Sequence, residues 1–331
     1  MLAQTKAWGM LLLLWLAWSS SAQAVQGDLL AHLVQQKRYM EVSRMIDARL
    51  ARNATDPVAL AASVDIYLTR SRPDVPLARA VAERCVNANP GSSLCAEALG
   101  HALTAQKRAG GLVAAIGNAR PIRNAFERAI RFDPMNYRAR VALVRFHLAM
   151  PSFLGGSEIR ARELATEARR SEPELSRLIR ALCAINDKKF DEAEGYILAA
   201  DLSPYALVDD SQRDVLLTLA GAHLAAGRHD ASRKLFEELG RCVPSSEHAP
   251  YGLALIAQAQ GRLGDAVTLL ENAAAIGPRP YIYRTLGEVH EARADGPRAV
   301  LAYRAALIGI PRLTWQEQRQ VTTHLTQLQQ R

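Results

Sequence analysis

The chain has 331 residues, with 49% hydrophobic and 22% charged residues and a formal net charge of +8 at pH 7. After the first 24 residues, no apolar segment is long enough to span a bilayer, which excludes a protein with several membrane spans. Among the four cysteines, no two form a C-x-x-C pair, and their spacings are not typical of a zinc site. These are Cys85, Cys95, Cys183 and Cys242.

The N-terminus resembles a cleavable secretory signal. Lys6 precedes an apolar run from Ala7 to Trp18, and small residues then lead to Ala24. We predict cleavage after Ala24, with an uncleaved membrane anchor as the alternative. Because no cysteine stands at the cleavage point, a lipoprotein is not expected. The mature chain is predicted to be periplasmic or secreted, without stable membrane insertion.

Basic residues are dispersed along the mature chain. Their densest stretch runs from Arg120 to Arg145, and few aromatic residues lie among them. A solvated, arginine-rich helix face is therefore favoured over a nucleic-acid groove. We expect no nucleic-acid partner.

Prolines recur along the chain at intervals of roughly 30 to 45 residues. Proline ends a helix because it cannot continue the backbone hydrogen-bond pattern. The series therefore predicts repeated helical units with an end at each proline. The prolines are Pro57, Pro90, Pro134, Pro173, Pro204, Pro244, Pro278 and Pro311.

A fixed pattern precedes most of these prolines. Ala266, Leu270 and Ala273 stand before Pro278, and steps of four and three residues place them on one helical face. The same spacing recurs at Ala78-Ala82-Cys85, Phe126-Ala129, Ala161-Ala165-Ala168, Ser232-Phe236-Leu239 and Ala299-Tyr303-Ala306. We predict that this face is buried between successive helix pairs.

The unit from His248 to Pro278 resembles the tetratricopeptide repeat (TPR), with small residues at a helix crossing and a turn at Gly261-Arg262-Leu263-Gly264. The resemblance covers about residues 28 to 311. It implies an all-α fold, a right-handed superhelical solenoid of antiparallel helix pairs. The segment Pro151-Ser152-Phe153-Leu154-Gly155-Gly156-Ser157 is similar to an insertion in secreted bacterial TPR proteins, some linked to transport systems.

Four segments are predicted. Residues 1–24 are the signal, 25–200 an N-terminal array, 201–312 a C-terminal array, and 313–331 a helix that caps the open end. In the unit ending at Pro134, about ten extra residues are expected to enlarge the hairpin loop before a helix that starts near Pro121. In the next unit, Ser157 is expected to cap the helix after the insertion.

Cys85 is expected at the end of one hairpin's second helix, and Cys95 at the start of the next hairpin's first helix. Those ends should meet, so an oxidising compartment favours a Cys85–Cys95 disulfide. Two buried free thiols are the alternative, because Cys85 occupies a position that alanine fills in other units.

Motifs that carry catalysis or bind cofactors are absent from the sequence. There is no phosphate loop, no His-Glu-x-x-His, no Gly-x-Ser-x-Gly and no dinucleotide fingerprint. An enzyme, a cofactor and a metal site are therefore not expected. The turn at Gly155-Gly156-Ser157 could present backbone amides to an anion, although a plain loop with a helix cap is the simpler interpretation.

The first helix of each pair should line a concave surface, where solenoid proteins commonly hold partners. We call eight positions on two neighbouring first helices the first-helix stripe: His248, Tyr251, Leu255, Gln258, Tyr281, Arg284, Glu288 and Glu291. The predicted function is a scaffold or adaptor for a polypeptide, with Tyr251 as an anchor and Arg284 pairing with a carboxylate. As alternatives for the site, the stripe could be an ordinary solvated surface, or the partner could bind the face of Arg138 and Arg145. As an alternative for the function, the protein could hold a small ligand for a transport or envelope-biogenesis system.

Overall fold

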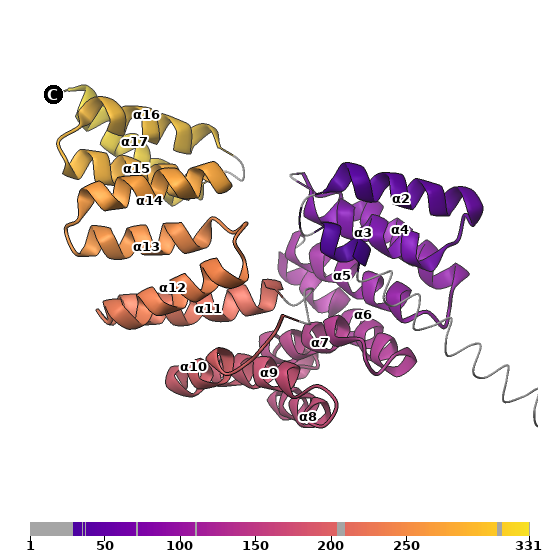
Figure 1. The fold of residues 1–331 in the computed structure, drawn as a ribbon. Helices are drawn as coiled ribbons and strands as arrows, with labels where there is room; N and C mark the ends of the chain where they lie inside the picture. Colours follow the sequence, from indigo (N-terminus) through magenta and orange to yellow (C-terminus); the bar gives the residue numbers. More distant parts are fainter. Residues whose placement is uncertain are drawn as a thin grey trace, which may run out of the picture. The chain divides into compact units, whose positions relative to one another are not determined.

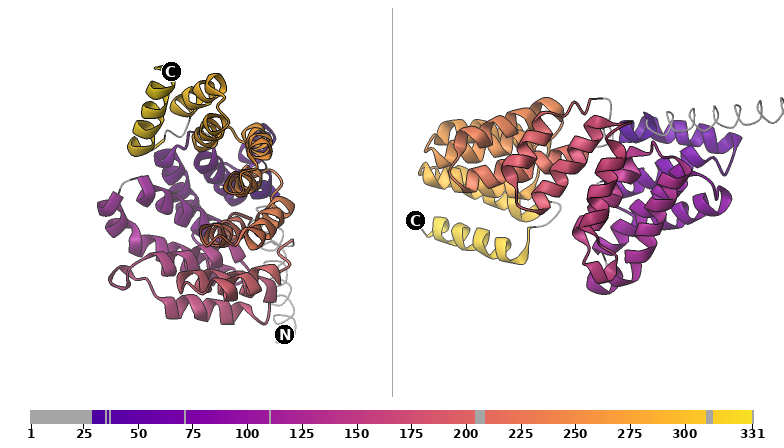
Figure 2. Two further views of the ribbon diagram at one scale, coloured as in Figure 1. Left: turned by 90° about the vertical axis from the view of Figure 1, so that its left-hand side faces the viewer. Right: turned by 90° about the horizontal axis from the view of Figure 1, so that it is seen from below.

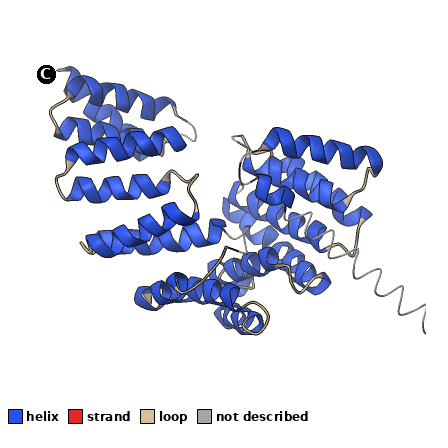
Figure 3. Ribbon diagram, in the orientation of Figure 1, coloured by secondary structure: helices blue, strands red, loops and turns tan. Residues whose placement is uncertain are grey.

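The computed structural model of the protein describes residues 29–34, 36, 38–70, 72–109, 111–203, 209–309 and 313–330. The predicted signal segment lies outside these residues. Within them, regular secondary structure consists of helices connected by turns and short loops, and no strand is present (Figure 3). The predicted all-α fold is confirmed.

The chain divides into two compact units (Figure 1). One contains the described residues up to Asn186 together with 199–203, and the other contains Asp187–Leu198 and the described residues from Asp209 onward. The first unit holds α2 (Tyr39–Arg52), α3 (Pro57–Thr69), α4 (Val75–Ala88), α5 (Ser93–Ala109), α6 (Gly111–Phe132), α7 (Tyr137–Ala149), η1 (Ser152–Leu154), α8 (Glu158–Ala168) and α9 (Pro173–Asn186).

The second unit begins with α10 (Phe190–Leu198) and continues as a stack of helical hairpins. Helices α11 and α12, α13 and α14, and α15 and α16 pack as pairs. Their bounds are α11 (Asp209–Ala225), α12 (His229–Cys242), α13 (His248–Ala259), α14 (Leu263–Ile276), α15 (Pro280–Ala292), α16 (Gly296–Ile308) and α17 (Trp315–Gln329).

The repeated pattern marks the buried face of the six helices that carry it, α4, α6, α8, α12, α14 and α16, as predicted. Ala266, Leu270 and Ala273 are fully buried, and they pack with Ala254 and Ile282 of the neighbouring first helices. The corresponding residues of the other hairpins are also buried: Ala78, Ala82, Cys85, Phe126, Ala129, Ala161, Ala165, Ala168, Ser232, Phe236, Leu239, Ala299, Tyr303 and Ala306.

Close helix contact in the second unit depends on two glycines. A Cβ on Gly287 would lie 2.5 Å from the ring of Tyr303, and one on Gly252 would lie 2.1 Å from the ring of Phe236. Both distances are shorter than a carbon contact allows, so only glycine lets these aromatic rings lie against the neighbouring helix.

The predicted enlarged loop before Pro121 is wrong. The extra residues are helical, because α5 continues to Ala109 and α6 starts at Gly111 and contains Pro121 within it. The segment Leu112-Val113-Ala114-Ala115-Ile116 contains no glycine or proline, and Pro121 removes one backbone hydrogen bond from the helix without ending it. The hairpin is therefore lengthened rather than interrupted.

The segment from Met150 to Ser157 forms a short 3-10 turn and then a tight bend. Gly155 has a φ of 93°, and a Cβ on Gly156 would lie 1.7 Å from the Met150 carbonyl oxygen. The Ser157 hydroxyl accepts from Arg160 N at 3.2 Å and caps α8, as predicted. The amides of Gly155, Gly156 and Ser157 donate to Ser152, Pro151 and His147 carbonyls, so the loop uses its own donors.

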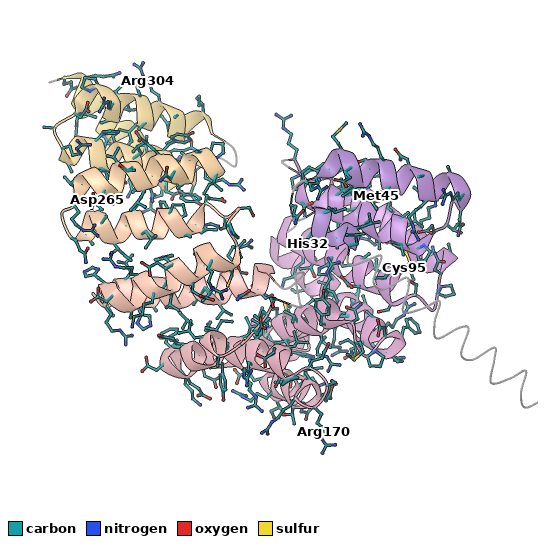
Figure 4. All side chains as sticks on the ribbon, in the orientation of Figure 1. His32, Met45, Cys95, Arg170, Asp265 and Arg304 are labelled. Carbon is teal, nitrogen blue, oxygen red and sulfur yellow. A yellow bond between two sulfur atoms is a disulfide. The ribbon has the colours of Figure 1, made fainter. Side chains whose placement is uncertain are left out.

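Cys85 and Cys95 are joined by the predicted disulfide, with their Cα atoms 5.3 Å apart (Figure 4). Both residues are fully buried and pack beside Leu60. The bond connects the end of α4 to the start of α5, and so links one hairpin to the next.

The predicted C-terminal helix is present as α17. It begins with a capping box in which Thr314 and Glu317 satisfy each other's backbone amides. Val321 and Leu325 pack on Tyr303 and Ala306 of α16, so α17 covers the last repeated face (Figure 2). Among the described helices, none is long and apolar enough to cross a bilayer.

Candidate partner-binding surface on the first helices

Helices α13 and α15 carry the first-helix stripe, and its Tyr251 and Tyr281 pack against the edge of the hydrophobic core. Ala249, Ala254 and Ala257 of α13 are buried, whereas His248 and Tyr251 are only partly buried. Pro280 starts α15 at a position where its missing amide costs nothing, and Ile282 and Val289 of α15 are buried. All eight stripe residues are partly exposed: His248, Tyr251, Leu255, Gln258, Tyr281, Arg284, Glu288 and Glu291.

Three stripe residues form one aromatic platform across the two helices. The rings of His248 and Tyr281 are stacked, with centroids 6.1 Å apart and planes 1° from parallel. Tyr251 meets Tyr281 edge-on at 4.8 Å, and its hydroxyl lies 3.3 Å from the Thr285 hydroxyl. Such aromatic pairs prefer offset or edge-on contact, so this arrangement fixes the ring positions before any ligand arrives.

A partly buried ion pair between Arg279 and Glu247 lies beside the platform. Arg279 donates from Nε to the Glu247 carboxylate at 2.9 Å, and the Glu247 side chain is 9% exposed. Burial alone would raise the pKa of Glu247, but its backbone amide and Arg279 lower it. Burial lowers the pKa of His248, and the Tyr281 hydroxyl lies 3.2 Å from its Nδ1.

The other end of the stripe is charged and already paired within the protein. Arg284 donates from Nη1 to Glu317 of α17 at 2.8 Å, and its Nε lies 3.6 Å from the Glu288 carboxylate. The expected role of Arg284 as a free carboxylate anchor would therefore require displacement of Glu317. Burial raises the pKa of Glu288, and the Arg284 cation opposes that shift.

Glu291 is held by two donors. The Tyr303 hydroxyl donates to its carboxylate at 2.9 Å, and His324 Nδ1 lies 2.9 Å from the same oxygen. Burial, together with the Glu291 carboxylate, raises the pKa of Tyr303, so the hydroxyl keeps its proton and remains a donor. Glu288, Glu291 and Glu317 thus give this end of the surface an acidic character.

Sequence reasoning missed the residues that α17 contributes. Glu317 and His324 contact α15 from a helix that was predicted only to cap the array. Their spacing of seven residues places them on one face of α17, which was the signal available in the sequence.

The alternative Arg138 face of the first unit is also internally paired. Arg138 lies 3.0 Å from Glu97 and 3.3 Å from Asp65, and thus links α7 to α5 and α3. Asn136 donates to the same Glu97 carboxylate at 2.9 Å. Arg140, expected on a solvated face, is buried and donates to the Pro134 carbonyl at 2.7 Å. The expectation of a fully solvated arginine face is therefore wrong for Arg138 and Arg140, which replace water with protein partners.

Within the part of the chain that the structure describes, no group of histidine, cysteine, aspartate and glutamate side chains is arranged to hold a metal ion.

Comparison with solved structures gives the fold of the chain. Yeast Tom70 matches with a TM-score of 0.62 and 14% sequence identity, covering 88% of this chain and 59% of that chain. The APC/C heterotetramer of Cut9 and Hcn1 matches with a TM-score of 0.52 and 13% identity, covering 94% of this chain and 54% of that chain. The chain thus spans under two thirds of the length of either. No protein-family model and no curated protein matches it. The helix pairs, the repeated buried face and this likeness together show that the chain has the fold of a tetratricopeptide-repeat protein.

Proposed function

We propose that the protein is an exported, non-catalytic scaffold that binds a polypeptide along the first-helix stripe. The observation that carries the proposal is the platform of His248, Tyr251 and Tyr281, which is built by two successive hairpins and is partly exposed. Tyrosine at the centre of a surface is typical of binding hot spots, because it offers a large rigid contact and a hydroxyl.

The charges beside the platform define the segment that it would accept. Arg284 already has a carboxylate partner in Glu317, so a basic residue of the ligand fits better than an acidic one. Glu288 is 39% exposed on its side chain and lies next to Glu291 in the same face of α15. We therefore propose a ligand with an apolar or aromatic residue on the platform and a lysine or arginine against Glu288.

A library of displayed peptides selected against the mature chain tests the chemistry of this surface. We expect the enriched peptides to combine an aromatic or large apolar residue with a nearby basic residue. Selection repeated on Tyr251→Ala/Glu288→Gln should lose that enrichment, whereas Thr268→Ala, on the exposed side of α14, should keep it. Enrichment that is the same on both variants would place the binding surface elsewhere. The rival function, a protein that holds a small ligand, predicts that no peptide is enriched.

A further inference from the structure

The last hairpin exposes apolar side chains on the outer face of its second helix. Leu301 is 65% exposed and Ile308 is 83% exposed, and Arg304 lies between them. Steps of three and four residues place all three on one face of α16, opposite the buried Ala299, Tyr303 and Ala306. We call Leu301, Arg304 and Ile308 the outer stripe.

In the other hairpins the equivalent face of the second helix is exposed to solvent. In the five other second helices that carry the repeated buried pattern (α4, α6, α8, α12 and α14), the positions that match Leu301 and Ile308 are exposed. Their residues are small or polar: Ala80 and Asn87, Asn124 and Arg131, Glu163 and Arg170, Lys234 and Arg241, and Thr268 and Ala275. Packing within the array therefore gives no reason for leucine and isoleucine in the last hairpin.

The charge of the central position is also reversed. The residues equivalent to Arg304 are Glu83, Glu127, Thr166, Glu237 and Glu271. An acidic residue thus stands there in four of the five other second helices that carry the repeated buried pattern, and an arginine stands there in α16. Arg304 extends away from the helix stack in Figure 4 and can meet a carboxylate from outside.

A groove adjoins the outer stripe. It has a volume of about 700 Å³ and lies between the end of α15, the start of α16 and the end of α17. Pro297, Val300, Leu301 and Leu328 give it a mainly apolar lining, and Glu291, Ala294 and Gly296 complete it. Leu301 belongs both to the groove and to the outer stripe, so the two form one continuous surface.

We propose that this surface docks an amphipathic helix of another protein, with apolar side chains in the groove and an acidic residue opposite Arg304. A concave apolar groove suits the convex apolar face of a helix. A flat membrane would contact Ile308 but could not fill the groove. Two copies of this chain pairing through the stripe around a twofold axis at Arg304 would bring the two arginines together, which is repulsive.

Stapled helical peptides of about 18 residues provide the probe, because shorter free peptides hold little helix. The acidic peptide carries leucines on one face and glutamates beside them, and the basic peptide replaces the glutamates with lysines. We expect the mature wild-type chain to bind the acidic peptide at least about tenfold more tightly than the basic one in fluorescence anisotropy. Leu301→Glu/Ile308→Glu should weaken that binding by about tenfold or more.

Arg304→Glu should invert the preference, so that the basic peptide binds better. The matched control, Thr268→Glu/Ala275→Glu, places the same charges at the equivalent positions of α14 and should leave binding unchanged. Unchanged circular dichroism confirms that each variant folds. Equal binding of both peptides, binding that the Leu301 and Ile308 changes leave intact, or no binding would overturn the proposal. Two other results would also overturn it. One is sedimentation of the wild-type chain with phosphatidylglycerol vesicles that Leu301→Glu/Ile308→Glu abolishes, and the other is self-association in ultracentrifugation that the same variant abolishes.

Discussion

Tyr281 of α15 stacks on His248 of α13 with the two ring planes 1° from parallel, so successive hairpins share one aromatic surface. The contact fixes the spacing of the two first helices where a ligand would lie. Because Tyr251 packs on the edge of Tyr281, a change to one ring affects the positions of all three.

The disulfide should contribute measurably to stability. Cys85→Ser/Cys95→Ser removes a bond that closes a short loop between two hairpins, and we expect a loss of about 2–4 kcal/mol in the free energy of unfolding. Non-reduced peptide mapping should recover the two cysteines crosslinked. Alkylation of both thiols in the absence of reductant would refute the bond.

Glu97 should make the first unit sensitive to acid. Burial would raise its pKa, but Arg138, His101 and Asn136 lower it to about 2. In the unfolded chain the carboxylate has its ordinary pKa of 4.5, so its stabilising contribution is complete above that pH. The contribution is lost as pH falls toward 2, because protons then bind the unfolded state first.

We therefore expect Glu97→Gln to lower the unfolding free energy of the first unit by about 3 kcal/mol at pH 7. Urea unfolding at a series of pH values should show this difference shrinking below pH 4.5 and disappearing near pH 2. Glu83→Gln breaks an exposed pair with Arg79 and serves as the control, with an expected cost below about 1 kcal/mol. A constant difference at every pH would contradict the assigned pKa.

The buried face of α14 leaves no room for a larger side chain. Ala273 is fully buried in the core, so Ala273→Phe should destabilise the second unit by about 1–3 kcal/mol. Ala275→Phe, two residues away on the exposed side, should cost much less. Equal melting temperatures for Ala273→Phe and the wild type would mean that this face does not pack as described.

Much of the fold could be predicted from the sequence because the spacing of small and apolar residues within each repeat indicates which face of its helix is buried. The Ala266-Leu270-Ala273 spacing predicts both a helix and its buried side, and the same spacing elsewhere predicts the stack. The hairpin around Pro121 could not be predicted in this way. A proline inside a helix gives the same local signal as a proline at a helix start, and only tertiary contacts decide between them.

The candidate site was predictable only in part. Helical periodicity placed His248, Tyr251, Tyr281 and Arg284 on one stripe, and the structure brings the aromatic members into contact. It did not predict the partner of Arg284. Glu317 lies 33 residues away on α17, and periodicity within one helix carries no information about which carboxylate reaches across to it.

Export is expected from the N-terminal sequence. Lys6, the apolar run and the residues up to Ala24 predict that the signal is removed. Mass spectrometry of the protein recovered from its native host should find Val25 at the N-terminus. A chain that keeps Met1 and sediments with membranes would show an uncleaved anchor instead.

The affinity of one selected peptide for the wild-type chain and for Tyr251→Ala/Arg284→Ala tests the central claim most directly. The first change removes the edge of the aromatic platform, and the second frees Glu317 and Glu288 from their cation. For the single change Tyr251→Ala we expect a loss of at least about 2 kcal/mol in binding free energy, which is about thirtyfold in Kd. The double variant should also bind less tightly than the wild type, because it too lacks the Tyr251 ring, and its helical circular-dichroism signal should be unchanged. Undiminished binding by both variants would contradict the account and move the site away from the first-helix stripe.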